Sequence, residues 1–153
     1  MVAMATVYIL QGLVAAGKST LARQLAQSTG AAILNPDTMV VAGTSENWDA
    51  RFQQAVQQMW TQATDYLAAG RDVILDMGFW YKADRDQARA LAKRYGAAVK
   101  HYYLRVPENI LRERIVATRP AVWAEKHLAD FARNQAAFEP PTPEEAAEVI
   151  ENY

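Results

Sequence analysis

Apolar residues follow two patterns that alternate along the chain. In the first, short apolar runs predict buried strands at 5–10, 31–34, 72–76 and 98–106. In the second, apolar residues recur every three or four positions and predict helices at 20–28, 48–67, 82–95, 107–118 and 123–138. Gly30, Gly70 and Gly96 stand shortly after three of these helices, where glycine commonly ends a helix.

The alternation of strands and helices predicts a doubly wound α/β domain. Strands joined by helical crossovers run parallel, and the crossovers place helices on both faces of the sheet. Residues 146–153 fit either a capped helix or, at Val149 and Ile150, another strand, so the pattern predicts a four- or five-stranded parallel sheet. In such sheets, ligands bind outside the carboxyl ends of the strands.

Length and composition narrow the class of protein. With 153 residues and no internal composition shift, the chain is expected to form one domain over residues 1–153. A net charge of −1 without a run of like charge argues against a nucleic-acid or membrane surface, and no stretch is long and apolar enough to span a bilayer. The absence of cysteine excludes disulfides and thiol chemistry. Residues 1–10 resemble a core strand more than a signal peptide, and we expect a cytoplasmic monomer or homodimer.

The loop after the first strand carries the most specific chemistry. Residues 12–20, Gly-Leu-Val-Ala-Ala-Gly-Lys-Ser-Thr, have glycine, lysine and hydroxyl at the spacing of a phosphate-binding loop, between a strand and a helix. Backbone N–H groups in such a loop converge on an anion, and the helix adds its positive end. We expect this loop to bind a triphosphate through Gly12, Ala15, Ala16, Gly17, Lys18, Ser19 and Thr20. Lys18 would reach the β- and γ-phosphates, and the Ser19 hydroxyl would be a ligand of Mg²⁺.

Two aspartates end strands beside this loop. Asp37 follows the second strand, where an acceptor hydroxyl would approach the γ-phosphate, and is the candidate catalytic base that binds this hydroxyl. Alternatively, the Asn35-Pro36-Asp37 turn uses the carboxylate only as a backbone cap. Asp76 ends the third strand and is expected to bind Mg²⁺ or the acceptor, unless it caps the next turn.

Arginines cluster late in the chain. Residues 105, 112, 114 and 119 are all arginine, a density that fits a phosphate clamp because the guanidinium fork binds two oxygens. Arg112 and Arg119 are expected to contact the nucleotide, Arg119 from a lid over about residues 117–128 that makes it part of the catalytic set. The alternative for Arg112 is a solvated ion pair with Glu108.

The segment after Asp76 supplies candidate acceptor contacts. Phe79, Trp80 and Arg85 are expected there, the arginine against an anionic group. The aromatic residues fit a core role as well, and Arg85 fits a surface ion pair with its flanking aspartates. His101 and His127 lack metal-ligand spacing and are assigned to structure.

Together these motifs resemble those of small P-loop kinases, a group of AAA-type ATP-binding proteins related to polynucleotide kinase, chloramphenicol phosphotransferase and zeta-toxin-like kinases. The resemblance rests on residues 12–20, 35–37, 73–80 with Arg85, 112–119 and 138–141, and spans nearly the whole chain. It implies a three-layer P-loop NTPase fold with an arginine-bearing lid. It also implies Mg²⁺ and ATP as cofactors, and transfer of the γ-phosphoryl group to a small-molecule hydroxyl with Asp37 as base.

Two departures bear on the acceptor and the loop. Kinases of this group usually carry Pro-Gly where this chain has Val14-Ala15, so a side chain must occupy a position that favours glycine. Polynucleotide kinases tend to place an arginine where this chain has Val40, which favours a neutral or partly apolar acceptor over nucleic acid. The alternatives are an ATP-binding regulatory module with little transfer activity and a nucleotide or polynucleotide kinase. GTP is less favoured than ATP because no Asn-Lys-x-Asp tetrapeptide occurs.

Overall fold

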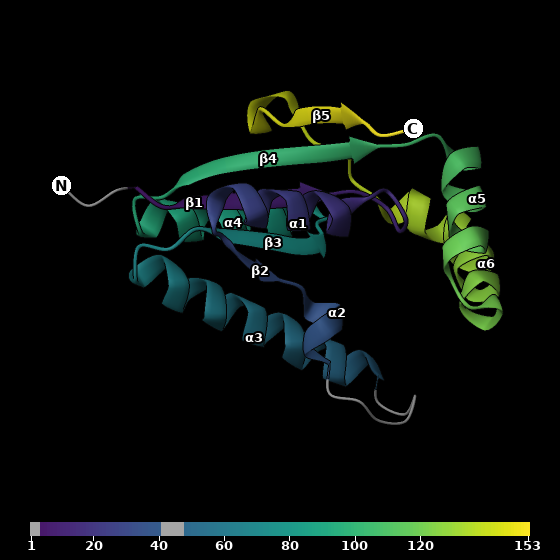
Figure 1. Ribbon diagram of the computed structural model, residues 1–153, viewed down its shortest axis with the longest axis horizontal. Coiled ribbons are helices and arrows are strands. Elements are labelled where there is room, and N and C mark those ends of the chain that lie inside the picture. Colours follow the sequence, from purple (N-terminus) through teal and green to yellow (C-terminus); the bar gives the residue numbers. More distant parts are fainter. Residues whose placement is uncertain (1–3, 41–47) are drawn as a thin grey trace.

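A sheet of five parallel strands forms the centre of the molecule. The structure is a computed structural model that describes residues 4–40 and 48–153. Strands β1 (Thr6–Gln11), β2 (Ala32–Leu34), β3 (Val73–Gly78), β4 (Ala98–Arg105) and β5 (Glu148–Glu151) lie in the order β2-β3-β1-β4-β5, with every neighbouring pair parallel (Figure 1). The predicted α/β fold is confirmed. The C-terminal stretch forms one 3₁₀ turn, Pro143–Glu145, followed by the fifth strand.

Helices connect these strands and cover both faces of the sheet. They are α1 (Lys18–Thr29), α2 (Pro36–Met39), α3 (Trp48–Ala68), α4 (Lys82–Arg94), α5 (Glu108–Thr118) and α6 (Ala121–Ala137). Five of them match the predicted ranges to within two residues, whereas the single-turn α2 was expected to be a loop. Helices α5 and α6 stand at the end of the sheet to which the strands point (Figure 1). Within the described ranges, no helix has the length and hydrophobicity of a bilayer span.

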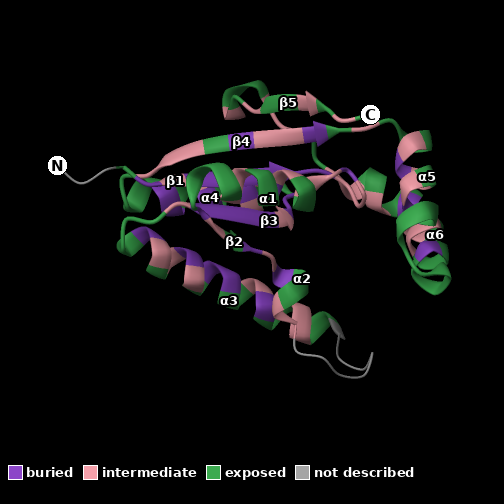
Figure 2. Cartoon of the chain, viewed as in Figure 1, coloured by how far each residue is buried: buried purple, intermediate pink, exposed green. Residues whose placement is uncertain are grey.

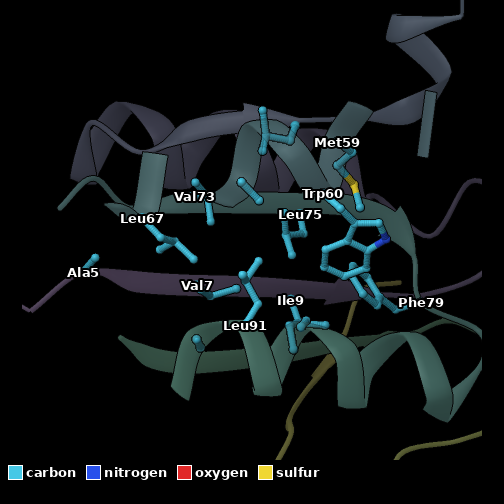
Figure 3. Close-up of a cluster of buried hydrophobic side chains, with 14 residues drawn as sticks. Ala5, Val7, Ile9, Met59, Trp60, Leu67, Val73, Leu75, Phe79 and Leu91 are labelled. Carbon is cyan, nitrogen blue, oxygen red and sulfur yellow. The ribbon is translucent and has the colours of Figure 1, made fainter. Parts of the chain in front are cut away.

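Alternate residues of the central strand pack against opposite helical layers. Val7 and Ile9 of β1 join a cluster with α3 and α4, which Figure 3 shows between the strands and these helices. Tyr8 and Leu10 point to the other face and join residues of α1. Because both faces are covered, β1 and β3 are almost fully buried, while the outer sides of the helices are exposed (Figure 2). This packing explains why the strands appear in the sequence as unbroken apolar runs.

A buried polar network fastens the C-terminal segment to the sheet. Glu145 accepts from Arg85 Nε at 2.7 Å and from Arg89 Nη1 at 2.9 Å. Arg89 Nη2 lies 2.8 Å from His101 Nδ1, and His101 Nε2 lies 2.7 Å from Gln11 Oε1. Burial acts to raise the pKa of Glu145, but the bonds from Arg85 and the Thr142 N–H outweigh it and hold the value at about 2. The network thus links β1, β4 and α4 to the turn at 143–145.

Arg85 belongs to this network, so its predicted contact with an acceptor is wrong. Its side chain is 0% exposed and also donates to the backbone oxygens of Phe79 and Glu139. The alternative of a surface ion pair with the flanking aspartates is wrong for the same reason. The actual partner, Glu145, lies 60 residues away in the sequence, and short-range charge patterning could not identify it.

His101 makes the stability of the fold depend on pH. Burial, aided by the neighbouring Arg89 cation, lowers the pKa of His101 to about 4. Since the unfolded histidine titrates near 6.5, the unfolded chain binds more protons below that pH, and stability falls as the pH drops from 6.5 towards 4. The loss should reach about 2 to 3 kcal/mol between pH 6.5 and 4.5.

The variant His101→Gln should remove this pH-dependent loss of stability, because glutamine keeps one donor and one acceptor but does not titrate. Urea unfolding at pH 7, 6, 5 and 4.5 should give a flatter dependence of the unfolding free energy on pH than in the wild-type protein. Equal slopes in the two proteins would contradict the role assigned to His101.

Candidate functional site

The carboxyl ends of three neighbouring strands bring the predicted site residues to one edge of the sheet. In β1 and β3, Gln11 pairs with Gly78, and the Gly12 N–H then donates to the Gly78 oxygen at 3.1 Å. In β2 and β3, Leu34 pairs with Leu75, one residue before Asp76. The loop at 12–20, the turn at 35–37 and Asp76 therefore lie side by side, as the parallel fold predicts.

The loop presents free backbone N–H groups at the start of α1. Gly17, the residue before the helix, has φ = 101°, a left-handed conformation that favours glycine. Within the described residues, the N–H groups of Ala15, Gly17, Lys18 and Ser19 have no hydrogen-bond acceptor. Unpaired donors at a helix N-terminus form a binding site for an anion such as phosphate. The predicted phosphate loop therefore has the expected geometry.

Ala15 confirms the expectation that a side chain occupies a glycine-type position. Its φ is 68°, in the left-handed region. For a residue with a Cβ, this conformation costs about 1 to 2 kcal/mol relative to the right-handed one. The loop is therefore strained at Ala15, and contacts around it must hold it in place.

Lys18 folds back onto the loop. Its Nζ donates to the backbone oxygens of Gly12 at 3.0 Å and Leu13 at 2.9 Å. Burial lowers the pKa of Lys18 to about 8; the nearby Asp76 and Asp37 carboxylates oppose this shift, while Arg119 adds to it. The ammonium thus lies within electrostatic range of Asp37, Asp76 and Arg119, three other residues that the sequence predicts at the site.

Ser19 and Asp76 form a hydrogen-bonded pair of side chains. The Ser19 hydroxyl donates to Asp76 Oδ2 at 3.0 Å, and Asn35 Nδ2 donates to the same oxygen at 3.3 Å. Burial raises the pKa of Asp76, although Lys18 and the bond from Ser19 oppose the shift. Oxygen ligands of this kind suit Mg²⁺, which usually keeps waters and phosphate oxygens as its other ligands. The described residues contain no group of three or more His, Cys, Asp or Glu side chains that could hold a metal by themselves.

Asn35, which sequence reasoning did not single out, connects the two aspartates. Its Oδ1 accepts from the Asp37 N–H at 2.9 Å and caps α2, while its Nδ2 holds Asp76. The alternative in which the Asp37 carboxylate is the cap is therefore wrong. The Asp37 side chain is left exposed at the site, without a hydrogen bond to any described residue.

The two aromatic residues after Asp76 have different surroundings. Phe79 is 1% exposed and packs edge-on against Trp60, with ring centroids 6.5 Å apart, so its predicted acceptor contact is wrong. Trp80 remains at the site, where its Nε1 donates to the Gly12 oxygen at 3.2 Å. It lines a small cavity between the loop and α6 with Leu13 and His127. The core role that the sequence left open applies to Phe79 alone.

The arginines of the predicted cluster contact different partners. Arg105 pairs with Glu151 on β5, and Arg112 pairs with Glu108 at 3.0 Å while lying over the Phe131 ring. The ion pair that was the alternative for Arg112 is thus present, and its contact with a nucleotide stays a prediction. Arg114 donates to the Ala15 oxygen from behind the loop. A joint phosphate clamp of all four arginines is not what the structure shows.

Arg119 and His127 face the site from the α5–α6 corner. Arg119 lies between the two helices, is exposed, and acts electrostatically on Lys18 and His127. Burial lowers the pKa of His127, Arg119 adds to this shift, and Asp37 opposes it. His127 also stacks on Trp123 with centroids 5.7 Å apart. The sequence predicted only a structural role for His127, whereas in the structure this residue also lines the cavity beside the loop.

Comparisons with known proteins agree with this fold and loop. Residues 7–141 match a family model described as AAA domain. Comparison with curated proteins gave no match. Similar solved structures include a candidate kinase from Chloroflexus aurantiacus, with 18% identity, a TM-score of 0.73, and coverage of 99% of this chain and 86% of that one.

Two further similar structures were solved with nucleotides or nucleotide analogues. Kti12 of Chaetomium thermophilum, in complex with ADP-AlF3, has 18% identity, a TM-score of 0.70, and coverage of 95% of this chain and 88% of that one. The Mycobacterium tuberculosis APS kinase CysC, in complex with AMPPNP and APS, has 16% identity, a TM-score of 0.63, and coverage of 95% and 88%. At these identities the likeness establishes the fold.

The lowered pKa of Lys18 predicts that nucleotide affinity depends on pH. A bound triphosphate would favour the ammonium and raise the pKa of Lys18 above its value of about 8 in the free protein. Affinity for Mg²⁺–ATP should therefore fall by only about twofold between pH 7 and 8, and above pH 8 by up to about tenfold per pH unit. Phosphate ionisation does not interfere, since its second pKa is about 6.

Isothermal titration calorimetry at pH 7 to 9.5 measures this dependence. The matched control is Lys18→Arg, whose guanidinium stays charged throughout, so its affinity, though lower, should not fall with pH. A flat profile for the wild-type protein would contradict the placement of Lys18 against the phosphates.

Proposed function

This chain belongs to the AAA domain family, and from that premise we propose that it is an ATP-dependent kinase that transfers the γ-phosphoryl group to a hydroxyl of a small molecule. The observation that carries the proposal is the meeting of three groups at one sheet edge. These are the free N–H groups of the loop with Lys18, the hydrogen-bonded Ser19–Asp76 pair, and the exposed carboxylate of Asp37. The first two bind a triphosphate, and the third adds a base beside it.

The proposed reaction follows from these positions. The acceptor oxygen attacks the γ-phosphorus, the bond from that phosphorus to the β,γ-bridging oxygen breaks, and ADP leaves with the electron pair of that bond. Asp37 orients the acceptor hydroxyl and takes its proton as the new P–O bond forms. Lys18, released from the Gly12 and Leu13 oxygens, and Arg119 neutralise charge on the phosphate oxygens.

Ser19 and Asp76 are the residues that would hold Mg²⁺. Their two oxygens are already directed to one another, and Asn35 keeps Asp76 in place. The ion would neutralise negative charge on the phosphates when bound. The remaining ligands would be phosphate oxygens and water, which fits the small number of protein oxygens at this point.

The acceptor is proposed to be a neutral or partly apolar small molecule. Asp37 is followed at the third position by Val40 and not by a cation, and the chain carries a net charge of −1. Trp80 and His127 line the small cavity beside the loop and offer ring surfaces there, and His127 lies within electrostatic range of Asp37. Nucleic acid would need basic side chains along its path, and Arg85, once a candidate, is buried in the network with Glu145.

A screen of phosphoryl transfer tests the proposal. The protein is incubated with Mg²⁺ and γ-³²P-labelled ATP against aminoglycosides, chloramphenicol-like alcohols, sugars, nucleosides and 5′-hydroxyl oligonucleotides. We expect label to move to a small hydroxyl compound. ATP binding without transfer to any acceptor would favour the regulatory module, and transfer to oligonucleotides alone would favour a polynucleotide kinase.

Asp37→Asn should strongly slow phosphoryl transfer but leave nucleotide binding nearly unchanged. Loss of the base should lower kcat by about 10²- to 10⁴-fold, because asparagine cannot take the proton. Affinity for Mg²⁺–ATP should change by less than about threefold, since the carboxylate has no bond to the loop. The control is Asp86→Asn, whose carboxylate pairs with Lys82 on the surface. Full activity of Asp37→Asn would remove this residue from the mechanism.

Arg119→Ala should slow transfer more than it weakens ATP binding. An arginine that stabilises charge mainly in the transition state lowers kcat when removed, here by about 10²-fold or more, with ATP affinity reduced only a few-fold. Arg133→Ala, an exposed arginine of α6 paired with Asp130, is the matched control. The readout is transfer to the acceptor found in the screen, alongside calorimetric ATP binding. The reverse pattern, weaker ATP binding with a normal kcat, would mean that Arg119 contributes to binding of ATP but not to stabilisation of the transition state.

A further inference from the structure

Two side chains donate hydrogen bonds to the phosphate loop from the side opposite the proposed phosphates. Arg114 of α5 donates from Nη1 to the Ala15 oxygen at 3.2 Å, and Asn152, just after β5, donates from Nδ2 to the Ala16 oxygen at 2.9 Å. The two are braced against each other, because Arg114 Nη2 donates to the Asn152 oxygen at 2.6 Å. Both are distant in sequence from the loop, by 99 and 136 residues. They form one unit, which we call the loop brace.

The brace determines where the loop N–H groups point. In a trans peptide, the carbonyl and the N–H point in opposite directions. Binding the Ala16 oxygen from outside therefore turns the Gly17 N–H inwards. Binding the Ala15 oxygen fixes the preceding peptide plane, whose Ala16 N–H donates to the Leu13 oxygen at 3.1 Å within the loop. The Gly17 N–H is one of the donors left without an acceptor among the described residues. A brace on the outside thus produces a phosphate-binding surface on the inside.

Close packing shows how tightly the brace fits. An ideal Cβ placed on Gly17 would lie 2.4 Å from Asn152 Nδ2, so this asparagine lies directly against the glycine backbone. Ala15, whose oxygen Arg114 binds, is the strained residue at φ = 68°. A strained conformation persists only where the surrounding contacts hold it in place. Arg114 and Asn152 provide such contacts, because they bind the carbonyl of Ala15 and that of the next residue, Ala16.

We propose that Arg114 and Asn152 are positioning residues for nucleotide binding, which hold the loop in its phosphate-binding conformation and offset the strain of Ala15. The inference rests on the proposed function, because it concerns the affinity of the same loop for a nucleotide. It assigns Arg114 to the back of the loop and not to the phosphates. In this chain, the brace takes over part of the role that glycine would serve at position 15.

The test measures binding of Mg²⁺–AMPPNP by calorimetry to Arg114→Met and Asn152→Leu, which keep side-chain size but lose the donors. Each should bind the nucleotide about tenfold more weakly, because Ala15 then favours the right-handed region and turns the loop amides away. Matched controls are Arg133→Met on α6 and Tyr153→Phe beside Asn152, which should bind like the wild-type protein. Thermal unfolding of every variant is recorded in the same buffers.

The decisive comparison adds Ala15→Gly to each brace variant. Glycine adopts left-handed and right-handed conformations about equally, so the loop needs the brace less. Added to Arg114→Met or Asn152→Leu, Ala15→Gly should raise the affinity for the nucleotide at least about threefold. In the otherwise wild-type protein, Ala15→Gly should change this affinity by less than about twofold. A merely structural role of Arg114 or Asn152 would not be rescued by glycine at position 15.

Several outcomes would overturn the inference. Wild-type affinity in both Arg114→Met and Asn152→Leu would do so, as would weakened binding that Ala15→Gly leaves unchanged. If Arg114→Met does not fold, Arg114→Lys replaces it; the lysine reaches one carbonyl only and should show a smaller loss with the same rescue. Failure of the wild-type protein to bind AMPPNP would instead refute the proposed function, and the brace with it.

Discussion

The parallel register of β1 and β3 is the constraint on which the site depends. It places the end of β1 beside Gly78, and the bond from the Gly12 N–H to the Gly78 oxygen continues the pairing into the loop. Because of this register, Ser19 at the start of α1 meets Asp76 on β3, and Asp76 in turn meets Asn35 at the end of β2. A slip by one residue would turn Asp76 to the opposite face of the sheet and separate it from Ser19.

Side chains around the phosphate loop donate hydrogen bonds to its backbone carbonyls. The directions of the N–H groups proposed to bind a triphosphate depend on every peptide plane between Gly12 and Ser19. The loop carbonyls of Gly12, Ala15 and Ala16 receive donors from Trp80, Arg114 and Asn152, respectively. The buried network around Glu145 fastens the segment that leads into β5, at whose end Asn152 stands. The C-terminal segment therefore contacts the phosphate loop, although the two are far apart in the sequence.

Local patterns in the sequence predicted most of the fold and the centre of the site. Hydrophobic periodicity placed five helices and four strands, and the loop motif together with the strand-end rule placed Lys18, Ser19, Asp37 and Asp76 at one edge. The errors concern residues whose role depends on distant partners. Arg85 resembled a surface residue because Glu145 lies far along the chain, and Phe79 resembled a site residue because its contact with Trp60 arises only on folding. Arg114 and Asn152 carry no local signal, since the groups that they bind are backbone carbonyls.

Amide hydrogen exchange of the loop tests the central claim most directly, because it reports on the N–H groups themselves. Exchange is measured for the wild-type protein with and without Mg²⁺–AMPPNP, with residues of α3 and α4 as internal references. If the loop holds the phosphates through its backbone, the amides of Ala15, Gly17, Lys18 and Ser19 should become strongly protected on binding, while the reference helices change little. Nucleotide binding that leaves these amides exchanging at their free rates would contradict the account.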